Sequence, residues 1–318
     1  MRAIRIARSV GRFWAGTGLA TVIGGAILAA LGPPQPAKPA RPELVRHLYH
    51  GAIPPPNPKL LVASPANPAW MIPRQSGKTK PMAYYAAPAH LSNGLHRVAI
   101  LVGGIGEALK PSLDAVTSLP PSVSLALTPY GPHVQDVAAA ARKAGHETLL
   151  GLPMETSREP TVTEGDEALH GSELDSVNQR RLDWALSRAA GYAGVTDEIG
   201  MTTDETFLSQ AMNSQWLGKH LQTTGLFMVT ASRGVKLPPG IPGRRADVVI
   251  HPEMSGADQL QSLNQLAGVA VVQGSALGVI SSPTASDIDI LTKWCAGLKA
   301  QGLVLVPVSA LIAPRKTK

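Results

Sequence analysis

One short apolar run limits the folds open to this chain more than any other feature. Residues 98–102 read Val-Ala-Ile-Leu-Val and are followed at once by Gly103 and Gly104. Such a run, bounded by glycine, is typical of a buried parallel strand with a loop at its carboxyl end. Ligands bind at that end in open α/β sheets and in β/α barrels. Residues 103–106 nevertheless offer no side chain that could bind a metal ion or transfer a proton, which limits the chemistry available there.

Alternating strand and helix signals continue to the end of the chain. Short apolar runs predict further strands at residues 123–127, 148–152, 194–195, 226–230, 248–250, 276–280 and 303–307. Helical periodicity predicts helices at residues 133–144, 174–190, 204–221, 257–272 and 285–300. Strands that alternate with helices form parallel sheets, so we expect an α/β fold. About seven strands separated by helices favour a distorted (β/α)7-type barrel over an open sheet.

Several common reactive motifs are absent from the sequence. The glycines at residues 103–106 are too few and too close for a dinucleotide-binding fingerprint, and the sequence has no GxxxxGK[ST] loop. It also has no Gly-x-Ser-x-Gly nucleophile elbow. We therefore expect neither a nucleotide partner nor a nucleotide cofactor, and no serine-nucleophile chemistry.

The charge of the chain says little about its folded part. The net charge is +7, but much of the excess lies at the two ends, in residues 1–12 and in a basic tail at 313–318. No basic patch alternates with aromatic residues, so we expect no nucleic-acid partner. Cys295 is the only cysteine, which excludes an intrachain disulfide, and its apolar helical surroundings favour a buried structural thiol.

The N-terminal residues have the pattern of a membrane segment. A basic stretch at residues 1–12 is followed by an uncharged apolar run at 13–31. About 20 apolar residues span a bilayer, and the positive charge before them favours a cytoplasmic N-terminus. We therefore expect a single-pass inner-membrane anchor with the main domain in the periplasm. A signal peptide cleaved near Ala29 and Ala30 is the alternative, and it also places the main domain beyond the membrane.

Residues 32–90 have the composition of a linker. They contain fourteen prolines and show neither helical nor alternating periodicity. We expect a mostly disordered, extended spacer here. The folded domain is then predicted to occupy residues 91–312.

Four stretches resemble the divergent polysaccharide deacetylase family, a branch of the NodB-like carbohydrate esterases. They are Val-Ala-Ile-Leu-Val at 98–102, Leu-Pro-Pro-Ser-Val-Ser-Leu-Ala-Leu-Thr-Pro-Tyr-Gly-Pro-His at 119–133, Ala-Gly-His-Glu-Thr-Leu-Leu-Gly-Leu-Pro-Met-Glu-Thr at 144–156 and Leu-Val-Pro-Val-Ser-Ala-Leu at 305–311. The resemblance implies a distorted β/α barrel. It also implies the family's chemistry, in which a divalent metal and acid/base groups remove acetyl from an N-acetyl sugar.

The sequence departs from the family's active-site motifs at four places. Gly103 and Gly104 stand where family members that look active have Asp-Asp, and Glu198 stands at the position of the motif histidine. Thr-Ala-Ser at 230–232 replaces Asp-Ser-Arg, and Ser-Ser-Pro at 281–283 replaces Gly-His-Pro. The resemblance therefore implies a cleft whose metal ligands have been replaced. Its expected lining is Gly103, Gly104, Asp197, His251, Ser281 and Ser282.

Two glutamates are the candidate catalytic residues, Glu155 in the retained Pro-Met-Glu and Glu198. In a purely structural interpretation, Glu155 orders a loop, and His146 of the retained Gly-His-Glu caps a turn or lies on a solvated turn. We expect no metal and no cofactor. As an alternative, carboxylates and one imidazole near the predicted strand ends could hold a divalent ion such as Zn²⁺. These residues are Asp197, Glu198, Asp204, Asp247, His251 and Glu253.

Three functional hypotheses follow from these features. In the first, a membrane-anchored extracytoplasmic domain without metal-dependent catalysis binds envelope glycan or an envelope protein through the old cleft. In the second, the protein is an active carbohydrate deacetylase or other hydrolase with a rearranged metal site at Glu155, Glu198 and His251. In the third, it is a structural scaffold of the envelope that binds no glycan.

Overall fold

The computed structural model describes residues 52–91, 94–157, 159, 161, 163–200, 206–232 and 234–312. Within those ranges, none of the helices combines the length and the apolar character needed to cross a bilayer. The predicted membrane segment at 13–31, the basic stretch before it and the basic tail at 313–318 lie outside the described residues.

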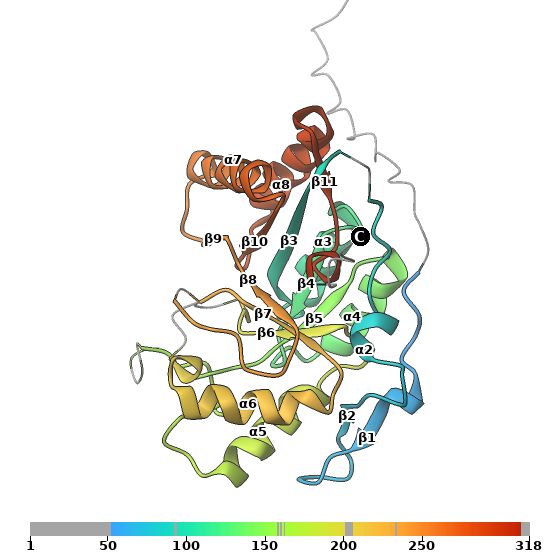
Figure 1. Ribbon diagram of the computed structural model, residues 1–318, viewed down its shortest axis with the longest axis vertical. Helices are drawn as coiled ribbons and strands as arrows, with labels where there is room; N and C mark the ends of the chain where they lie inside the picture. The colour runs from blue at the N-terminus through green and yellow to red at the C-terminus, as the bar shows by residue number, and fades with distance from the viewer. Residues whose placement is uncertain are drawn as a thin grey trace, which may run out of the picture. The chain divides into compact units, whose positions relative to one another are not determined.

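A parallel sheet of nine strands forms the centre of the described chain (Figure 1). The strand order is β8-β7-β6-β5-β4-β3-β10-β9, and β11 also pairs with β3. The strands are β3 (His96–Ile105), β4 (Ser124–Leu127), β5 (Thr148–Gly151), β6 (Gly194–Thr196), β7 (Phe227–Thr230), β8 (Gly243–Arg245), β9 (Val248–Ile250), β10 (Ser275–Ile280) and β11 (Leu303–Leu305). The first predicted strand is longer than expected and runs through Gly103 and Gly104.

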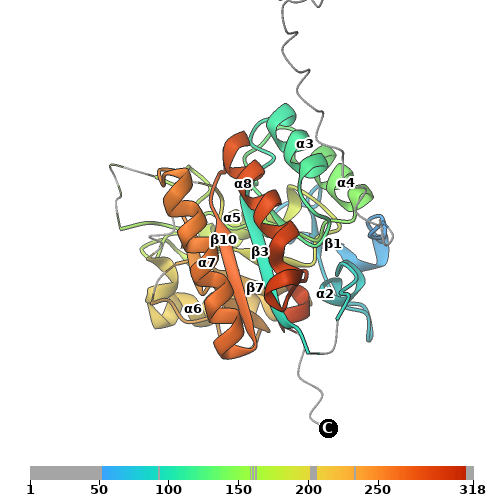
Figure 2. The same cartoon turned by 90° about the horizontal axis from the view of Figure 1, so that it is seen from above.

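Helices follow most of the strands and pack outside the sheet. They are α3 (Leu109–Ser118), α4 (Val134–Ala144), α5 (Asp175–Ser187), α6 (Ala211–Gln222), α7 (Gly256–Gln273) and α8 (Ala285–Gly297). Viewed from above, α7 and α8 cover β10 and β3 (Figure 2). The remaining helical segments are short: η2 (Phe207–Ser209), η3 (Leu298–Gln301) and α9 (Ser309–Ile312).

Local chemistry explains where several helices begin and end. Gly145 ends α4 with a φ of 88°, a left-handed conformation that glycine adopts without strain. Thr284 and Asp287 form a capping box at the start of α8. The sequence pattern did not predict α3, whose first turn contains Pro111; proline is tolerated there because the first-turn amides have no intrahelical partner.

The first and last strands in this order, β8 and β9, are adjacent in the chain. Only Ala246 and Asp247 separate β8 from β9 in the chain. The Ala246 amide donates a hydrogen bond to the Thr230 carbonyl of β7, and the Asp247 amide donates one to the Leu277 carbonyl of β10, both at 2.8 Å. The sheet is therefore strongly curled. The predicted α/β class is confirmed, with a curled parallel sheet of the half-barrel type.

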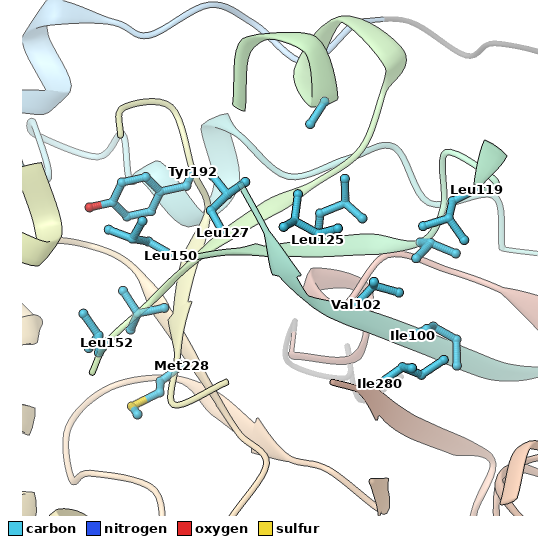
Figure 3. Packing of buried hydrophobic residues seen from close by; sticks show 14 of the residues in the cluster. Ile100, Val102, Leu119, Leu125, Leu127, Leu150, Leu152, Tyr192, Met228 and Ile280 are labelled. Carbon is cyan, nitrogen blue, oxygen red and sulfur yellow. The ribbon is translucent and has the colours of Figure 1, made fainter. Parts of the chain in front are cut away.

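Two hydrophobic clusters lie on the two faces of the curled sheet. Along β3, Ile100 and Val102 belong to the cluster between sheet and helices, whereas Ala99 and Leu101 belong to the cluster on the inner face. Figure 3 shows Ile100 and Val102 among the side chains of the outer cluster. Because successive side chains of a strand point to opposite faces, Gly103 continues the inner series.

Residues 52–90 are folded, so the expectation of a disordered spacer is wrong for this part of the linker. They contain η1 (Pro58–Leu60), β1 (Leu61–Ala63), β2 (Met71–Pro73) and α2 (Pro81–Tyr84), and β1 pairs antiparallel with β2. Ile53, Leu60, Tyr85 and Ala87 are buried in the inner cluster. Proline is compatible with this structure because Pro58 and Pro81 occupy the first helical turn. Residues 32–51 lie outside the described residues.

Both ends of the described chain cover the amino ends of the strands. The Ile53 amide donates to the carbonyl of Arg142 near the end of α4, and the Val306 amide donates to the carbonyl of Val98 near the start of β3. Glu147, just before β5, accepts hydrogen bonds from the amides of Ala87 and Ser309. At the carboxyl ends of the strands, where Gly103 and Gly104 lie, the surface is formed by the strand–helix loops.

Candidate functional site

Glu198 stands over Gly103 at the carboxyl end of the sheet. The Glu198 side chain is fully buried, with 0% of its surface exposed. A Cβ atom at position 103 would lie 2.6 Å from Glu198 Cγ, a distance that real Cβ atoms do not reach. The Glu198 carboxyl therefore occupies the space that any side chain at position 103 would need.

Both carboxyl oxygens of Glu198 are engaged by neighbouring loops. The Gly200 amide donates to Oε1 at 2.6 Å, and the Ser281 hydroxyl donates to Oε2 at 2.5 Å. Burial raises the pKa of Glu198 to about 7; the hydrogen bonds from Ser281 and Gly200 oppose this shift, and the nearby Asp197 carboxyl adds to it. The structure thus brings Glu198 and Ser281 together, as residues that fill the site.

Asp197 connects the ends of two neighbouring strands. Its Oδ1 accepts a hydrogen bond from the Ala231 amide at 2.7 Å, and its Oδ2 accepts one from the Ser232 amide at 3.2 Å. Burial raises the pKa of Asp197, against the effect of these hydrogen bonds. The carboxylate is therefore committed to holding the loop after β7 against the loop after β6.

Ser282 has the only positive φ of a non-glycine residue in the described ranges, 37°. Its hydroxyl donates a hydrogen bond to the carbonyl of Gly200, and a Cβ atom at Gly104 would lie 3.1 Å from Ser282 Cα. Backbone strain of this kind often marks functional loops. In this protein, these contacts bring together three loops, the ones that contain Gly104, Gly200 and Ser282.

A cavity of about 470 Å³ adjoins these loops, between the first turns of α3 and α8. Gly103, Gly104 and Ser282 lie on its wall, whereas Asp197, His251 and Ser281 are not among the residues that line it. Ile105, Ala115 and Ile288 provide apolar lining, and Glu107 and Asp114 add carboxylates. The cavity offers a mainly apolar surface with a few polar groups, which is the usual character of a small-ligand site.

Glu155 lies in a separate group of polar residues after β5. Its Oε2 accepts a hydrogen bond from the Gly171 amide at 3.0 Å and lies 3.6 Å from His170 Nδ1. The same imidazole nitrogen lies 3.3 Å from Glu159 Oε2. The side chain of Asn178 both accepts from and donates to the His170 backbone, which fixes this residue. Glu155 therefore orders a loop.

Sequence reasoning missed His170. It lies in a polar segment without periodicity, and its partner Glu155 is fifteen residues earlier in the chain. An isolated β-bridge between Met154 and Leu169 brings the two segments together. Only this non-local pairing identifies the imidazole as a neighbour of Glu155.

The described residues do not fit a divalent metal ion at this end of the sheet. Gly103 and Gly104 have no ligating side chains, and both oxygens of Glu198 are hydrogen-bonded. Among the residues with described positions, no three His, Cys, Asp or Glu side chains are arranged to hold a metal ion. Glu155, Glu198 and His251 are thus not brought together as ligands.

The other residues proposed as alternative metal ligands are Asp247, His251, Glu253 and Asp204, and the structure describes the first three. Asp247 accepts hydrogen bonds from Arg244 at 2.9 Å and from the Leu277 amide at 2.7 Å. His251 is half-buried just after β9, and Glu253 is exposed. Asp204 lies outside the described residues.

His146 and Glu147 belong to the amino end of the sheet, away from the cleft. The two ring nitrogens of His146 lie 2.8 Å from the Val123 carbonyl and 3.0 Å from the Val116 carbonyl. Burial lowers the pKa of His146 and raises that of Glu147. The retained Gly-His-Glu stretch therefore has a structural role, although its histidine lies in the core and not on a solvated turn.

Comparison with known proteins agrees with the resemblance. The model of the family "Divergent polysaccharide deacetylase" matches residues 100–312. An uncharacterized protein of Agrobacterium tumefaciens C58, solved by crystallography, is 28% identical; the match covers 80% of this chain and 99% of that chain, with a TM-score of 0.68. A protein of Enterococcus faecalis V583 whose name refers to cellobiose-phosphate cleavage is 12% identical over 68% of this chain and 99% of that chain, with a TM-score of 0.47.

No curated protein matches the chain. The family model, however, covers most of the sequence and nearly all of the parallel sheet. The chain belongs to the divergent polysaccharide deacetylase family.

Proposed function

We propose that this protein is a membrane-anchored, extracytoplasmic member of its family that binds cell-envelope glycan without metal-dependent hydrolysis. The observation that carries the proposal is the position of Glu198. Its buried carboxyl stands over Gly103 and is held there by Ser281 and Gly200. The place where the family resemblance implies metal ligands is filled by a hydrogen-bonded side chain.

The chemistry of deacetylation supports this proposal. An amide is hydrolysed when a metal ion polarises its carbonyl and lowers the pKa of a bound water. The loops of this chain offer glycines, serines and an enclosed carboxyl at the same place. A glycan can be bound by such loops, but none of these groups activates water in the manner of a metal.

The scaffold that would bind the glycan is retained. The strands form a curled parallel sheet of the half-barrel type, with helices packed on its outer side. The segments that follow β3 and β10 line the cavity beside Gly103 and Gly104. Binding sites on such folds lie at this end.

The predicted anchor fits this arrangement. Residues 1–12 are basic and residues 13–31 are apolar, which favours a cytoplasmic N-terminus and a periplasmic domain. The described chain enters at Ile53, on the side of the amino ends of the strands.

The proposal is tested with the full-length protein in detergent micelles. Peptidoglycan fragments and N-acetylchitohexaose serve as probes, with and without added Zn²⁺ or Mn²⁺. We expect saturable binding of at least one probe, measured by calorimetry, and no release of acetate. Acetate release that depends on a stoichiometrically bound metal would overturn the proposal in favour of a rearranged active site. If neither probe binds, the proposal is overturned in favour of an envelope scaffold.

A further inference from the structure

Tyr130 is the most exposed aromatic side chain in the described part of the chain, with 37% of its surface accessible. It lies in the loop between β4 and α4, at the carboxyl ends of the strands. Every other aromatic residue in these ranges is buried or half-buried. Within these ranges, the ring of Tyr130 is therefore the aromatic surface most accessible to a ligand.

The ring of Tyr130 is held rigidly by α5. Its centroid lies 5.2 Å from that of Trp184, with the planes tilted by 44°. The Arg188 guanidinium lies 5.5 Å from the Trp184 ring centroid, and Arg188 Nε donates a hydrogen bond to the Pro129 carbonyl at 2.9 Å. Because the loop is fixed one residue before Tyr130, little conformational entropy remains to be lost on binding.

Polar groups surround the edge of this ring. Gly165, with a φ of +91°, lets the chain pass close to the Tyr130 hydroxyl, since a Cβ atom there would lie 2.7 Å from the hydroxyl oxygen. Glu167, which is held by two hydrogen bonds from Arg180, lies beside Tyr130 in the same loop as the exposed Asp166. The ring thus combines a flat apolar face with hydrogen-bond acceptors at its edge.

The Tyr130 loop adjoins the candidate cleft. The Thr128 amide donates a hydrogen bond to the carbonyl of Ile105 at 2.8 Å, and Ile105 lies on the wall of the cavity. Gly131 packs against the backbone of Gly106, so closely that a Cβ atom at position 131 would lie 2.6 Å from the Gly106 carbonyl carbon. The loop that carries Tyr130 therefore packs directly against the loop that forms one wall of the cavity.

We infer that Tyr130, supported by Trp184 and Arg188, is a glycan subsite that stacks against one pyranose ring. The C–H groups on one face of a pyranose are weakly positive and complement the negative face of the tyrosine ring. The sugar's hydroxyl and acetamido N–H groups are donors for the carboxylate of Asp166. A protein partner would instead favour a continuous apolar patch, whereas the residues beside this ring are charged. The inference rests on the proposed function and specifies which residues contact the glycan.

The test compares variants of the full-length protein in detergent, with N-acetylchitohexaose as the probe. Tyr130→Ala is expected to weaken binding about tenfold, the effect of losing a stacking contact of about 1.4 kcal/mol. Tyr130→Phe keeps the ring and is expected to bind nearly as well as the wild type. Tyr84→Ala is the matched control, because Tyr84 is a half-buried tyrosine of α2, at the opposite end of the sheet.

Fluorescence gives a second measurement that a loss of stability would not mimic. We expect the probe to change the tryptophan emission of the wild type, and this change to disappear in Trp184→Phe, which keeps an aromatic side chain. Equal binding by the wild type and Tyr130→Ala would overturn the subsite and leave glycan binding intact. If the wild type binds no glycan, both the subsite and the proposed function are overturned.

Discussion

Glu198 is a carboxylic acid enclosed on all sides, with one hydroxyl and one amide as its hydrogen-bond donors. Its pKa of about 7 lies well above the ordinary value of 4.5 because burial disfavours the charged form. At neutral pH the group is therefore partly protonated. Glu198 thus both fills the space beside Gly103 and makes a contribution to the free energy of unfolding that depends on pH.

The first prediction concerns the pH dependence of unfolding. A folded-state pKa above the unfolded one means that Glu198 stabilises the fold fully below about pH 4.5 and loses this effect as the pH rises through 7. The lost contribution is about 3 kcal/mol. Glu198→Gln removes the titration and keeps both hydrogen bonds possible. Urea unfolding at pH 5 and pH 8 should therefore show a smaller loss of stability in the variant than in the wild type.

If the wild type and Glu198→Gln lose the same free energy of unfolding between these two pH values, the pKa of Glu198 does not differ between the folded and unfolded states, which would contradict the raised pKa in the folded protein. Burial is the main cause of the raised pKa of Asp197 and is the same in both proteins, so most of the Asp197 contribution cancels in this comparison.

The second prediction concerns the fit between Gly103 and Glu198. Gly103→Ala would place a Cβ atom 2.6 Å from Glu198 Cγ and should lower the free energy of unfolding by about 1–3 kcal/mol. The double variant Gly103→Ala/Glu198→Ala should lower the free energy of unfolding by less than the sum of the two single changes, because the two side chains compete for one space. Denaturant titrations of the three variants measure this coupling.

Gly268→Ala is the control for this experiment. Gly268 lies in α7, and a Cβ atom added there would have no neighbour within 4 Å, so alanine should stabilise the protein by about 0.5–1 kcal/mol. Purely additive effects of Gly103→Ala and Glu198→Ala would contradict the close approach of these residues.

Among the structural elements, residues 52–90 form a folded segment although their proline-rich composition is typical of a linker, because their apolar side chains are buried. Its prolines predicted a spacer, yet its apolar residues dock on the inner face of the sheet. The Tyr85 hydroxyl accepts a hydrogen bond from the Asn57 amide at 2.8 Å, so one buried side chain fixes two parts of the segment. The short elements β1, β2 and α2 are stable because they pack on the domain, since strands of three residues are marginal alone.

The third prediction tests this docking. Tyr85→Ala removes a side chain that is 3% exposed and should lower the free energy of unfolding of the whole domain by about 3–5 kcal/mol. Tyr85→Phe loses only the hydrogen bond and should cost about 1 kcal/mol. Met71→Ala, at a residue of β2 that is 43% exposed, is the control with little expected effect. A spacer that does not pack on the domain would give no loss of stability in Tyr85→Ala.

At the scale of the whole molecule, the two ends of the strands have different roles. Residues 52–90 and the residues after β11 cover the amino ends, where Glu147 joins them through hydrogen bonds from Ala87 and Ser309. The carboxyl ends carry the glycine- and serine-containing loops, the cavity and Tyr130.

The fourth prediction concerns the membrane topology. In a Cys295→Ala background, Asp166→Cys near the proposed glycan subsite should react with a membrane-impermeant maleimide once the outer membrane is opened. Ser9→Cys, before the apolar run at 13–31, should react only after the inner membrane is also permeabilised. Labelling of both cysteines under the same condition would contradict a cytoplasmic N-terminus with a periplasmic domain.

Local patterns predicted much of the fold. The strand at 98–102 and the helix ending at Gly145 are encoded in contiguous residues, and both are present. The pattern was less informative where elements depend on their surroundings. Leu109–Ser118 forms α3 although Pro111 weakens its helical signal, and the expected helix at 204–221 begins at Ala211 in the described structure.

Residue types and their local order were sufficient to predict the α/β class, the family and the absence of ligating side chains at Gly103 and Gly104. The three-dimensional fold was needed to show that Glu198 fills the space beside Gly103, that His170 contacts Glu155, and that residues 52–90 pack on the domain. These contacts join residues far apart in the chain. Their formation depends on how the curled sheet brings loop ends together, which no local pattern specifies.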